Sequence, residues 1–158
     1  HFVPKDQWDN VKSTLLSSGD TSAINSLSPP PARLADWQTD IGAAFAGATL
    51  SAIYANLSDT PPLAHARKLM DRNSPLAMGA AIPIIDAARN TGTIEAALEM
   101  EYRFTYRAVA DSDFIEGIRA AIIDRDRTPK WRDTTAGDIL KMTAPLGAAT
   151  LDLSGAKL

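Results

Sequence analysis

The residues whose types and spacing most suggest binding chemistry lie in the stretch from Ser112 to Arg132. Its last part is strongly charged and also contains Pro129 and Trp131; the charged side chains are Asp124, Arg125, Asp126, Arg127, Lys130, Arg132 and Asp133. Such cations can bind phosphates, with Trp131 as an anchor or as a ring for stacking. A solvated helix end, whose cations interact with the last carbonyl groups, has the same pattern. The residue types alone favour the helix end and leave the phosphate patch open.

Glu101 is a second candidate, because it is a carboxylate on the apolar side of a helix that the pattern predicts over residues 93–111. Burial can raise the pKa of such a group and make it a general acid or base. Alternatively, Glu101 is buried in a pair with Arg103, Arg107 or Arg119 and holds two helices in register. The neighbouring arginines favour the pair. We therefore expect structural roles for Glu101, Arg119 and Trp131.

No residues in the sequence suit metal or nucleophilic catalysis. The chain has no cysteine, and its two histidines, His1 and His65, have no carboxylate or second imidazole at metal spacing. The sequence also contains no GxSxG elbow, glycine-rich phosphate loop or zinc signature. We predict no catalytic residue and no metal site within the chain.

Composition excludes several classes of partner. The 158 residues carry 16 basic and 19 acidic side chains, and the net charge of -3 gives no reason to expect nucleic acid. The apolar run over residues 41–55 is shorter than the roughly 20 residues that span a bilayer, so we predict no membrane segment. The cytoplasm is the default location. The opening "HFVP" has neither an initiator Met nor the features of a signal peptide, so we expect the sequence to begin within a longer protein.

The elements that must position these residues are all helical, because apolar residues recur at spacings of three and four and alternation is never longer than a few residues. Pro4 and Gly19 mark the ends of a first helix, Pro83 predicts a kink, and Asp113 with Glu116 predicts a capping box. The predicted helices lie within residues 4–19, 34–57, 63–70, 74–91, 93–111, 113–123 and 139–142.

Proline-rich stretches and a looser tail suggest four parts. The prolines of residues 28–32 predict a stiff linker. The predicted parts are a helical segment over 1–27, a proline-bounded connector over 28–73, a helical subdomain over 74–132 and a tail over 133–158.

Four motifs carry a resemblance to a known family: "SP" at Ser74, "EAALEMEYR" from Glu95, "DFIEGIRA" from Asp113 and "DRDRTPKW" from Asp124. With the opening "HFVP", they resemble the C-terminal part of the 3-hydroxyisobutyryl-CoA hydrolases of the enoyl-CoA hydratase (crotonase) superfamily. The motifs occur in the family's order over nearly the whole chain. Residues 13–73 are only weakly similar to it.

The resemblance implies a fold and a function. Such enzymes polarise the carbonyl of an acyl-CoA thioester with two backbone amides of a β-sheet core, and those groups lie upstream of the segment that matches His1. We therefore expect the helical C-terminal part of a crotonase-like protein, without its β-core and inactive alone. The missing N-terminal core and further copies of the protein would be its partners, and a coenzyme A thioester would be the substrate, with no separate cofactor.

The resemblance also gives "DRDRTPKW" a role, fixing a helix end, with Arg125, Arg127 and Lys130 as candidates for binding the phosphates of CoA. Two alternatives stay open. The parent enzyme could be an enoyl-CoA hydratase or isomerase, or the chain could be a non-catalytic helical interaction module.

Overall fold

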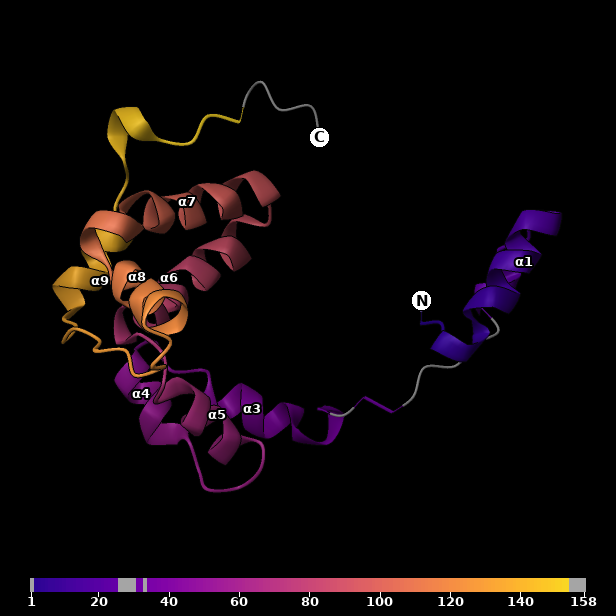
Figure 1. Ribbon diagram of the computed structural model, residues 1–158, viewed down its shortest axis with the longest axis horizontal. Helices are drawn as coiled ribbons and strands as arrows, with labels where there is room; N and C mark the ends of the chain where they lie inside the picture. The colour runs from indigo at the N-terminus through magenta and orange to yellow at the C-terminus, as the bar shows by residue number, and fades with distance from the viewer. Residues whose placement is uncertain (1, 26–30, 33, 154–158) are drawn as a thin grey trace. The chain divides into compact units, whose positions relative to one another are not determined.

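The computed structural model describes residues 2–25, 31–32 and 34–153 of the chain (Figure 1). Every regular element within these residues is a helix, which confirms the all-helical prediction. The chain divides into two compact units, residues 1–40 and 41–158. The four predicted parts stay a prediction, and most of the proline linker, residues 28–30, lies outside the described residues, as does His1.

The first unit is built around α1 (Trp8–Ser18), which follows the 3-10 turn η1 (Lys5–Gln7) and precedes α2 (Ser22–Asn25) and η2 (Ala35–Trp37). Helix α1 ends where the sequence predicts: Gly19 has φ 67° and donates its N–H to the Leu15 carbonyl. The Trp8 indole donates to the Val3 carbonyl at 2.9 Å, and Val11 is buried. These contacts fix the entry of the chain into α1.

Three short helices open the second unit. Helix α3 (Gln38–Ala44) runs into it, followed by α4 (Leu50–Asn56) and α5 (Leu63–Met70). Ala44, Leu57 and Leu63 form a small core, against which Ile41, Tyr54 and Met70 pack. The Arg67 guanidinium donates to the carbonyls of Tyr54 and Leu57, so it ties the last turn of α4 to α5.

A helical hairpin forms the centre of this unit. Helix α6 (Pro75–Thr91) has Ser74 as its N-cap, and α7 (Ile94–Asp111) has Thr93; each hydroxyl accepts a backbone N–H three residues on. Gly92, at φ 67°, makes the turn between them. Helix α6 continues through Pro83, so the proline expected to kink the helix does not end it.

Helix α9 (Ala136–Thr143) packs on both helices of the hairpin, and its Met142 is almost completely buried. The contact with α6 needs Gly79, because a Cβ at that position would lie 2.6 Å from Cδ1 of Ile139. Thr135 and Asp138 form a capping box at the start of α9. The sequence predicts only residues 139–142 and so misses the first turn of this helix.

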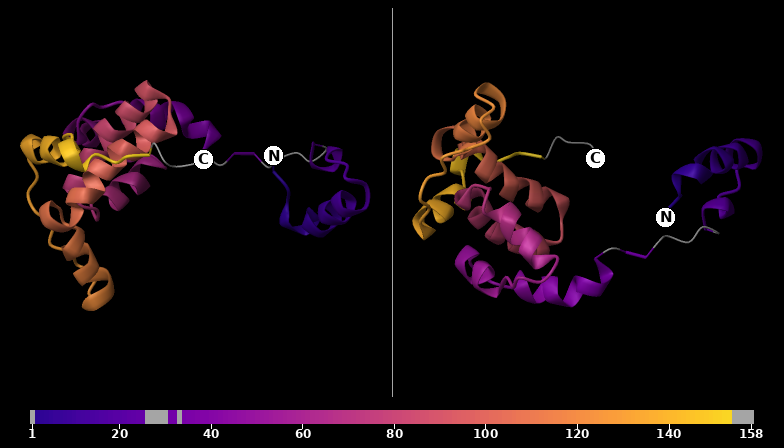
Figure 2. Two further views of the ribbon diagram at one scale, coloured as in Figure 1. Left: turned by 90° about the horizontal axis from the view of Figure 1, so that it is seen from above. Right: turned by 60° about the horizontal axis from the view of Figure 1, so that its bottom comes forward.

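Helix α8 (Phe114–Ile118) leaves the end of α7 and continues as a π-helical turn, η3 (Arg119–Ile123). Figure 2 shows this orange segment projecting from the α6–α7 hairpin. The irregular 3-10 turn η4 (Gly147–Ala149) lies in the tail. The charged loop, residues 124–132, follows directly after the π turn.

Candidate functional site

Arg119 is the centre of the charged loop. Its Nε and Nη2 donate to the two carboxylate oxygens of Glu116, both at 2.8 Å. Its Nη1 donates to Asp124 at 2.6 Å and to Asp126 at 2.7 Å. One guanidinium thus binds three carboxylates, and this charge-assisted network folds the loop back onto the π turn.

Within the sequence Asp124-Arg125-Asp126-Arg127, the network includes the two acidic residues and leaves out the two basic ones. Both aspartates bind Arg119, whereas the two arginines between and after them are exposed. Arg125 and Arg127 have φ of 57° and 54°, the left-handed region that side chains other than glycine rarely adopt. Such strained backbone persists only where its surroundings hold it.

Glu116 fastens the far end of the loop, because its Oε1 also accepts the backbone N–H of Lys130 at 2.7 Å. The Arg119 guanidinium and then this N–H lower the pKa of Glu116 to about 2. The predicted capping box of Asp113 and Glu116 is wrong: the Asp113 side chain makes no cap hydrogen bond, and Glu116 faces Arg119 instead. Asp126 likewise has a lowered pKa, mainly through Arg119.

Asp113 is a buried anchor that sequence reasoning missed. Its side chain is 2% exposed, accepts the Ser74 hydroxyl at 2.6 Å and accepts the Arg132 N–H at 3.2 Å. It therefore joins the start of α6 to the end of the charged loop. The sequence marks Asp113 only as a helix start, and nothing local to it shows that its partners lie 39 and 19 residues away.

Trp131 links the charged loop to the turn between α5 and α6. Its indole N–H donates to the Arg72 carbonyl at 3.0 Å, across 59 residues of sequence. Its ring packs against Gly117, since a Cβ there would lie 3.5 Å from the ring. Arg119 through Glu116 and Trp131 through Gly117 therefore both hold the loop against α8.

The predicted burial of Glu101 with an arginine is wrong. Glu101 is exposed on α7, and Arg103 pairs with Glu99 at 2.6 Å. Arg103 and Arg107 also donate to carbonyl groups at the end of α9, including Thr143 and Ala144. These guanidinium groups cap α9 through its unpaired carbonyls, which gives them partners that the spacing on α7 does not reveal.

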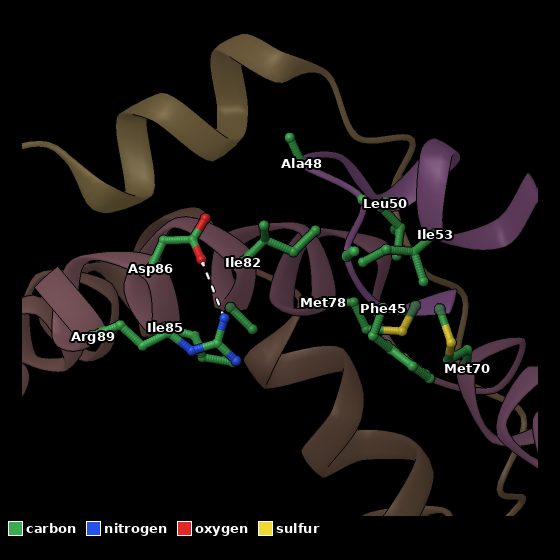
Figure 3. Close-up of a pocket in the computed structure, with 13 residues that line it drawn as sticks. Phe45, Ala48, Leu50, Ile53, Met70, Met78, Ile82, Ile85, Asp86 and Arg89 are labelled. Atoms are coloured by element: carbon green, nitrogen blue, oxygen red, sulfur yellow. Dashed lines mark ion pairs between the residues drawn. The ribbon is translucent and has the colours of Figure 1, made fainter. Parts of the chain in front are cut away.

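An apolar pocket of about 400 Å³ lies between the segment that leads into α4 and the exposed side of α6 (Figure 3). Phe45, Met70 and Met78 line one end, and Asp86 and Arg89 lie at the other, where their charged atoms are 4.0 Å apart. With one weak ion pair and no nucleophile among its lining side chains, the pocket suits apolar contact better than catalysis.

Over the described part of the chain, no three His, Cys, Asp or Glu side chains are grouped so that they could hold a metal ion. His65 is exposed on α5. None of the helices in these residues is both long and apolar enough to span a membrane.

The chain is similar to enzymes that act on CoA thioesters. The family model described as enoyl-CoA hydratase/isomerase matches residues 1–143. The mitochondrial 3-hydroxyisobutyryl-CoA hydrolase of Rattus norvegicus is 34% identical over 101 residues, which are 63% of this chain and 26% of that protein. The Mus musculus protein of the same name is 32% identical over 118 residues, or 70% and 30%.

Two solved structures match nearly the whole chain. An enoyl-CoA hydratase from Rhodobacter sphaeroides matches 96% of this chain with a TM-score of 0.84 and 42% identity, and a carnitinyl-CoA dehydratase from Mycobacterium thermoresistibile matches 98% with the same TM-score and 28% identity. The match covers 46% and 47% of those chains. This chain therefore spans about half of the solved structures and less than a third of the two hydrolases.

Proposed function

The chain belongs to the enoyl-CoA hydratase/isomerase family, and from this membership we propose that it is the C-terminal helical region of an acyl-CoA-processing enzyme, most like a 3-hydroxyisobutyryl-CoA hydrolase. The observation that carries the proposal is the agreement of two comparisons. The family model matches 143 residues, and the two hydrolases share about a third of the aligned residues. The reaction would be hydrolysis of a thioester.

In this proposal the chain provides structure around a catalytic core and contributes no catalytic side chain. Water attack on a thioester develops negative charge on the carbonyl oxygen, which preorganised N–H donors stabilise by several kcal/mol. The buried carboxylate of Asp113 instead binds Ser74 and Arg132 within the chain. The donors and acids of the reaction would belong to the part of the enzyme that this sequence does not include.

The exposed surface supports a covering role. Large apolar side chains are exposed on α7 and on the α8–π segment; those at least half exposed are Ile94, Tyr106, Val109, Phe114, Ile115, Ile122 and Ile123.

Thiol release tests the proposal. The isolated chain and the protein encoded by the complete reading frame around it are each given 3-hydroxyisobutyryl-CoA, and free CoA thiol is followed over time. We expect the complete protein to release thiol by turnover. The chain alone should release thiol only at the uncatalysed rate measured in buffer. Turnover by the chain alone would contradict its non-catalytic role.

A second substrate separates the alternatives. A hydratase parent would consume crotonyl-CoA without releasing thiol, and the hydratase relative from Rhodobacter sphaeroides, at 42% identity, keeps that reaction open. A complete protein that is inactive on both substrates would favour the helical interaction module.

The cations of the charged loop are our candidates for contact with the phosphates of CoA. Arg125, Arg127 and Lys130 are exposed, and their loop is held in one shape by Arg119. Replacing each by Ala in the complete protein should raise KM for the acyl-CoA by about tenfold, the usual effect of losing a charge-assisted hydrogen bond. Unchanged KM in all three variants would remove this role, and Lys12→Ala, at an exposed position of α1, is the matched control.

A further inference from the structure

The apolar pocket of about 400 Å³ beside α6 has the size of a small-molecule site, since such sites measure about 300–1,000 Å³ (Figure 3). Its lining side chains are apolar except at one end, where Asp86 and Arg89 lie. We propose that this pocket binds a medium-chain carboxylate, with the alkyl chain against Phe45, Met70 and Met78 and the carboxylate on the Arg89 guanidinium. Such a ligand is not a thioester and does not react in the pocket, so the inference goes beyond the proposed function.

Small residues and a closely held backbone leave the space for the pocket. Gly47, Ala48 and Ala81 line it. A Cβ at Gly47 would lie 2.9 Å from the backbone N of Ile53, so the segment that leads into α4 lies close against that helix. On the other side, α6 is helical from its Ser74 cap onward. Since both sides are in place without a ligand, binding requires little ordering, and preorganisation of this kind raises affinity.

An alkyl chain suits the apolar end of the pocket. Phe45 and Ile85 are exposed although both are large and apolar, and the thioethers of Met70 and Met78 lie near Phe45 (Figure 3). A chain bound here would be removed from water together with these side chains, which tightens binding by about fourfold for each buried CH₂ group. Methionine side chains are unbranched and flexible, so they adapt to the shape of such a chain.

The charges at the other end favour a carboxylate as the head of the ligand. Arg89 and Asp86 form a long ion pair, with 4.0 Å between Nη1 and Oδ1, and both side chains are more than half exposed. Among the described residues this is the one ion pair of Arg89. Side chains of a helix lean toward its N-terminus, and Figure 3 shows the Arg89 side chain lying back along α6 toward Ile85 and the apolar end. One guanidinium can bind several carboxylates, as Arg119 does in the charged loop, so Asp86 does not exclude the ligand.

Calorimetric titration of the full chain with octanoate, decanoate and decyltrimethylammonium tests the proposal. Decanoate should bind at least about tenfold more tightly than octanoate, because two more CH₂ groups leave water. Decyltrimethylammonium should bind at least about tenfold more weakly than decanoate, because the Arg89 guanidinium repels a cation. Equal affinity for the anion and the cation would overturn the proposal.

The four methionines can locate the bound alkyl chain. In NMR spectra of the chain with isotope-labelled methionine methyl groups, the signals of Met70 and Met78 should shift when decanoate is added. The signals of Met100 and Met142, which do not line the pocket, should stay in place. Unchanged signals of Met70 and Met78 would place the ligand elsewhere and would contradict the proposed site.

Two variants test the two ends of the pocket separately. Arg89→Gln should weaken decanoate binding by about tenfold, whereas Arg125→Gln, at an exposed arginine outside the pocket, should leave it unchanged. Ala81→Leu should fill part of the pocket and also weaken binding. Circular dichroism checks that the variants are folded, and Arg89→Gln decides alone if Ala81→Leu is not. Full affinity for decanoate in Arg89→Gln would reject the carboxylate site.

The same titration of the protein encoded by the complete reading frame separates this site from the proposed function. We expect that protein to bind decanoate as the chain does, whether or not it releases thiol from an acyl-CoA. Loss of decanoate binding there would show that another part of the protein fills the pocket, and the proposal would fail.

Discussion

At the scale of single residues, Arg119 decides the shape of the charged loop, and its partner Glu116 makes that shape sensitive to acid. Glu116 has a pKa of about 2 in the folded protein, below the ordinary value of 4.5, because Arg119 and the Lys130 N–H bind its charged form. A lowered pKa means that the carboxylate stabilises the fold fully above pH 4.5. This contribution is lost as the pH falls from 4.5 through about 2.

Glu116→Gln should therefore unfold at a lower urea concentration than the parent chain at pH 7, with the difference unchanged down to pH 5. Below pH 4.5 the two midpoints should converge, because protonated Glu116 and Gln carry the same charge. Urea titrations at several pH values measure this. A difference that stays constant to pH 2.5 would show that Glu116 does not titrate with the loop.

Asp113 is the residue whose loss should cost most stability. Asp113→Ala removes the acceptor that the Ser74 hydroxyl and the Arg132 N–H share at a part-buried site, so we expect the free energy of unfolding to fall by about 2 kcal/mol. Denaturant unfolding measures the change. The exposed neighbour Asp133 is the matched control, since Asp133→Ala should alter stability by less than about 0.5 kcal/mol.

The sequence predicted which kinds of residue would matter, but only some of the residues that they contact. The sequence singles out Trp131 by its place behind a helix end and Arg119 only as a possible partner of Glu101. Glu101 is misjudged, because Glu99, four residues before Arg103, was not weighed as the partner of that arginine. Asp113 and Arg72 depend on contacts that span 39 and 59 residues. Spacing along one helix carries no information on such contacts.

At the scale of elements, the packing of α9 on α6 depends on a missing side chain. A Cβ at Gly79 would overlap Cδ1 of Ile139, so Gly79→Ala should lower the free energy of unfolding by about 1 kcal/mol despite its better helix propensity. Ile139→Val removes that Cδ1. In a protein that already carries Gly79→Ala, Ile139→Val should restore most of the lost free energy of unfolding. Made alone, Ile139→Val should lower the free energy of unfolding by about 1 kcal/mol.

Chemical unfolding of the four proteins of this cycle gives the coupling between the two sites. Gly42→Ala in α3 is the control, because no atom lies within 4 Å of a Cβ there, and it should raise stability by up to about 1 kcal/mol. Additive effects of the Gly79 and Ile139 changes would mean that the two helices do not meet at this point.

Helix starts were more predictable than helix continuations. Ser74 and Thr93 cap their helices as the pattern predicts, because an N-cap acts within three residues. The π turn after α8 was not predictable, because it depends on the Arg119 network and on the Arg127 N–H that reaches Ala120. Helix α9 is an exception at its start: it begins three residues before the predicted 139–142, at the capping box of Thr135 and Asp138, which the pattern of apolar residues did not show.

At the scale of the whole molecule, the exposed apolar side chains predict self-association of the isolated chain. Exposed apolar patches of several hundred Å² bind other surfaces, and large apolar side chains of α7 and the α8–π segment are at least half exposed. We expect dimers or larger species in analytical ultracentrifugation. Ile115→Glu with Ile122→Glu should shift the distribution to smaller species, because both side chains are more than half exposed.

Leu16→Glu, at the most exposed large apolar side chain of α1, serves as the control and should leave the distribution unchanged. A single compact monomer for the unaltered chain would argue against apolar faces that need a cover.

The indole contact of Trp131 with the Arg72 carbonyl has a kinetic consequence. The α6–α7 hairpin joins residues that are close along the chain, whereas this contact closes a loop of 59 residues. Closing a long loop lowers the entropy of the chain, so we expect this contact to form late in folding. We expect Trp131→Phe to accelerate unfolding while leaving the folding rate nearly unchanged. The last contact to form would then be the first to open, and the charged loop would leave before the hairpin melts.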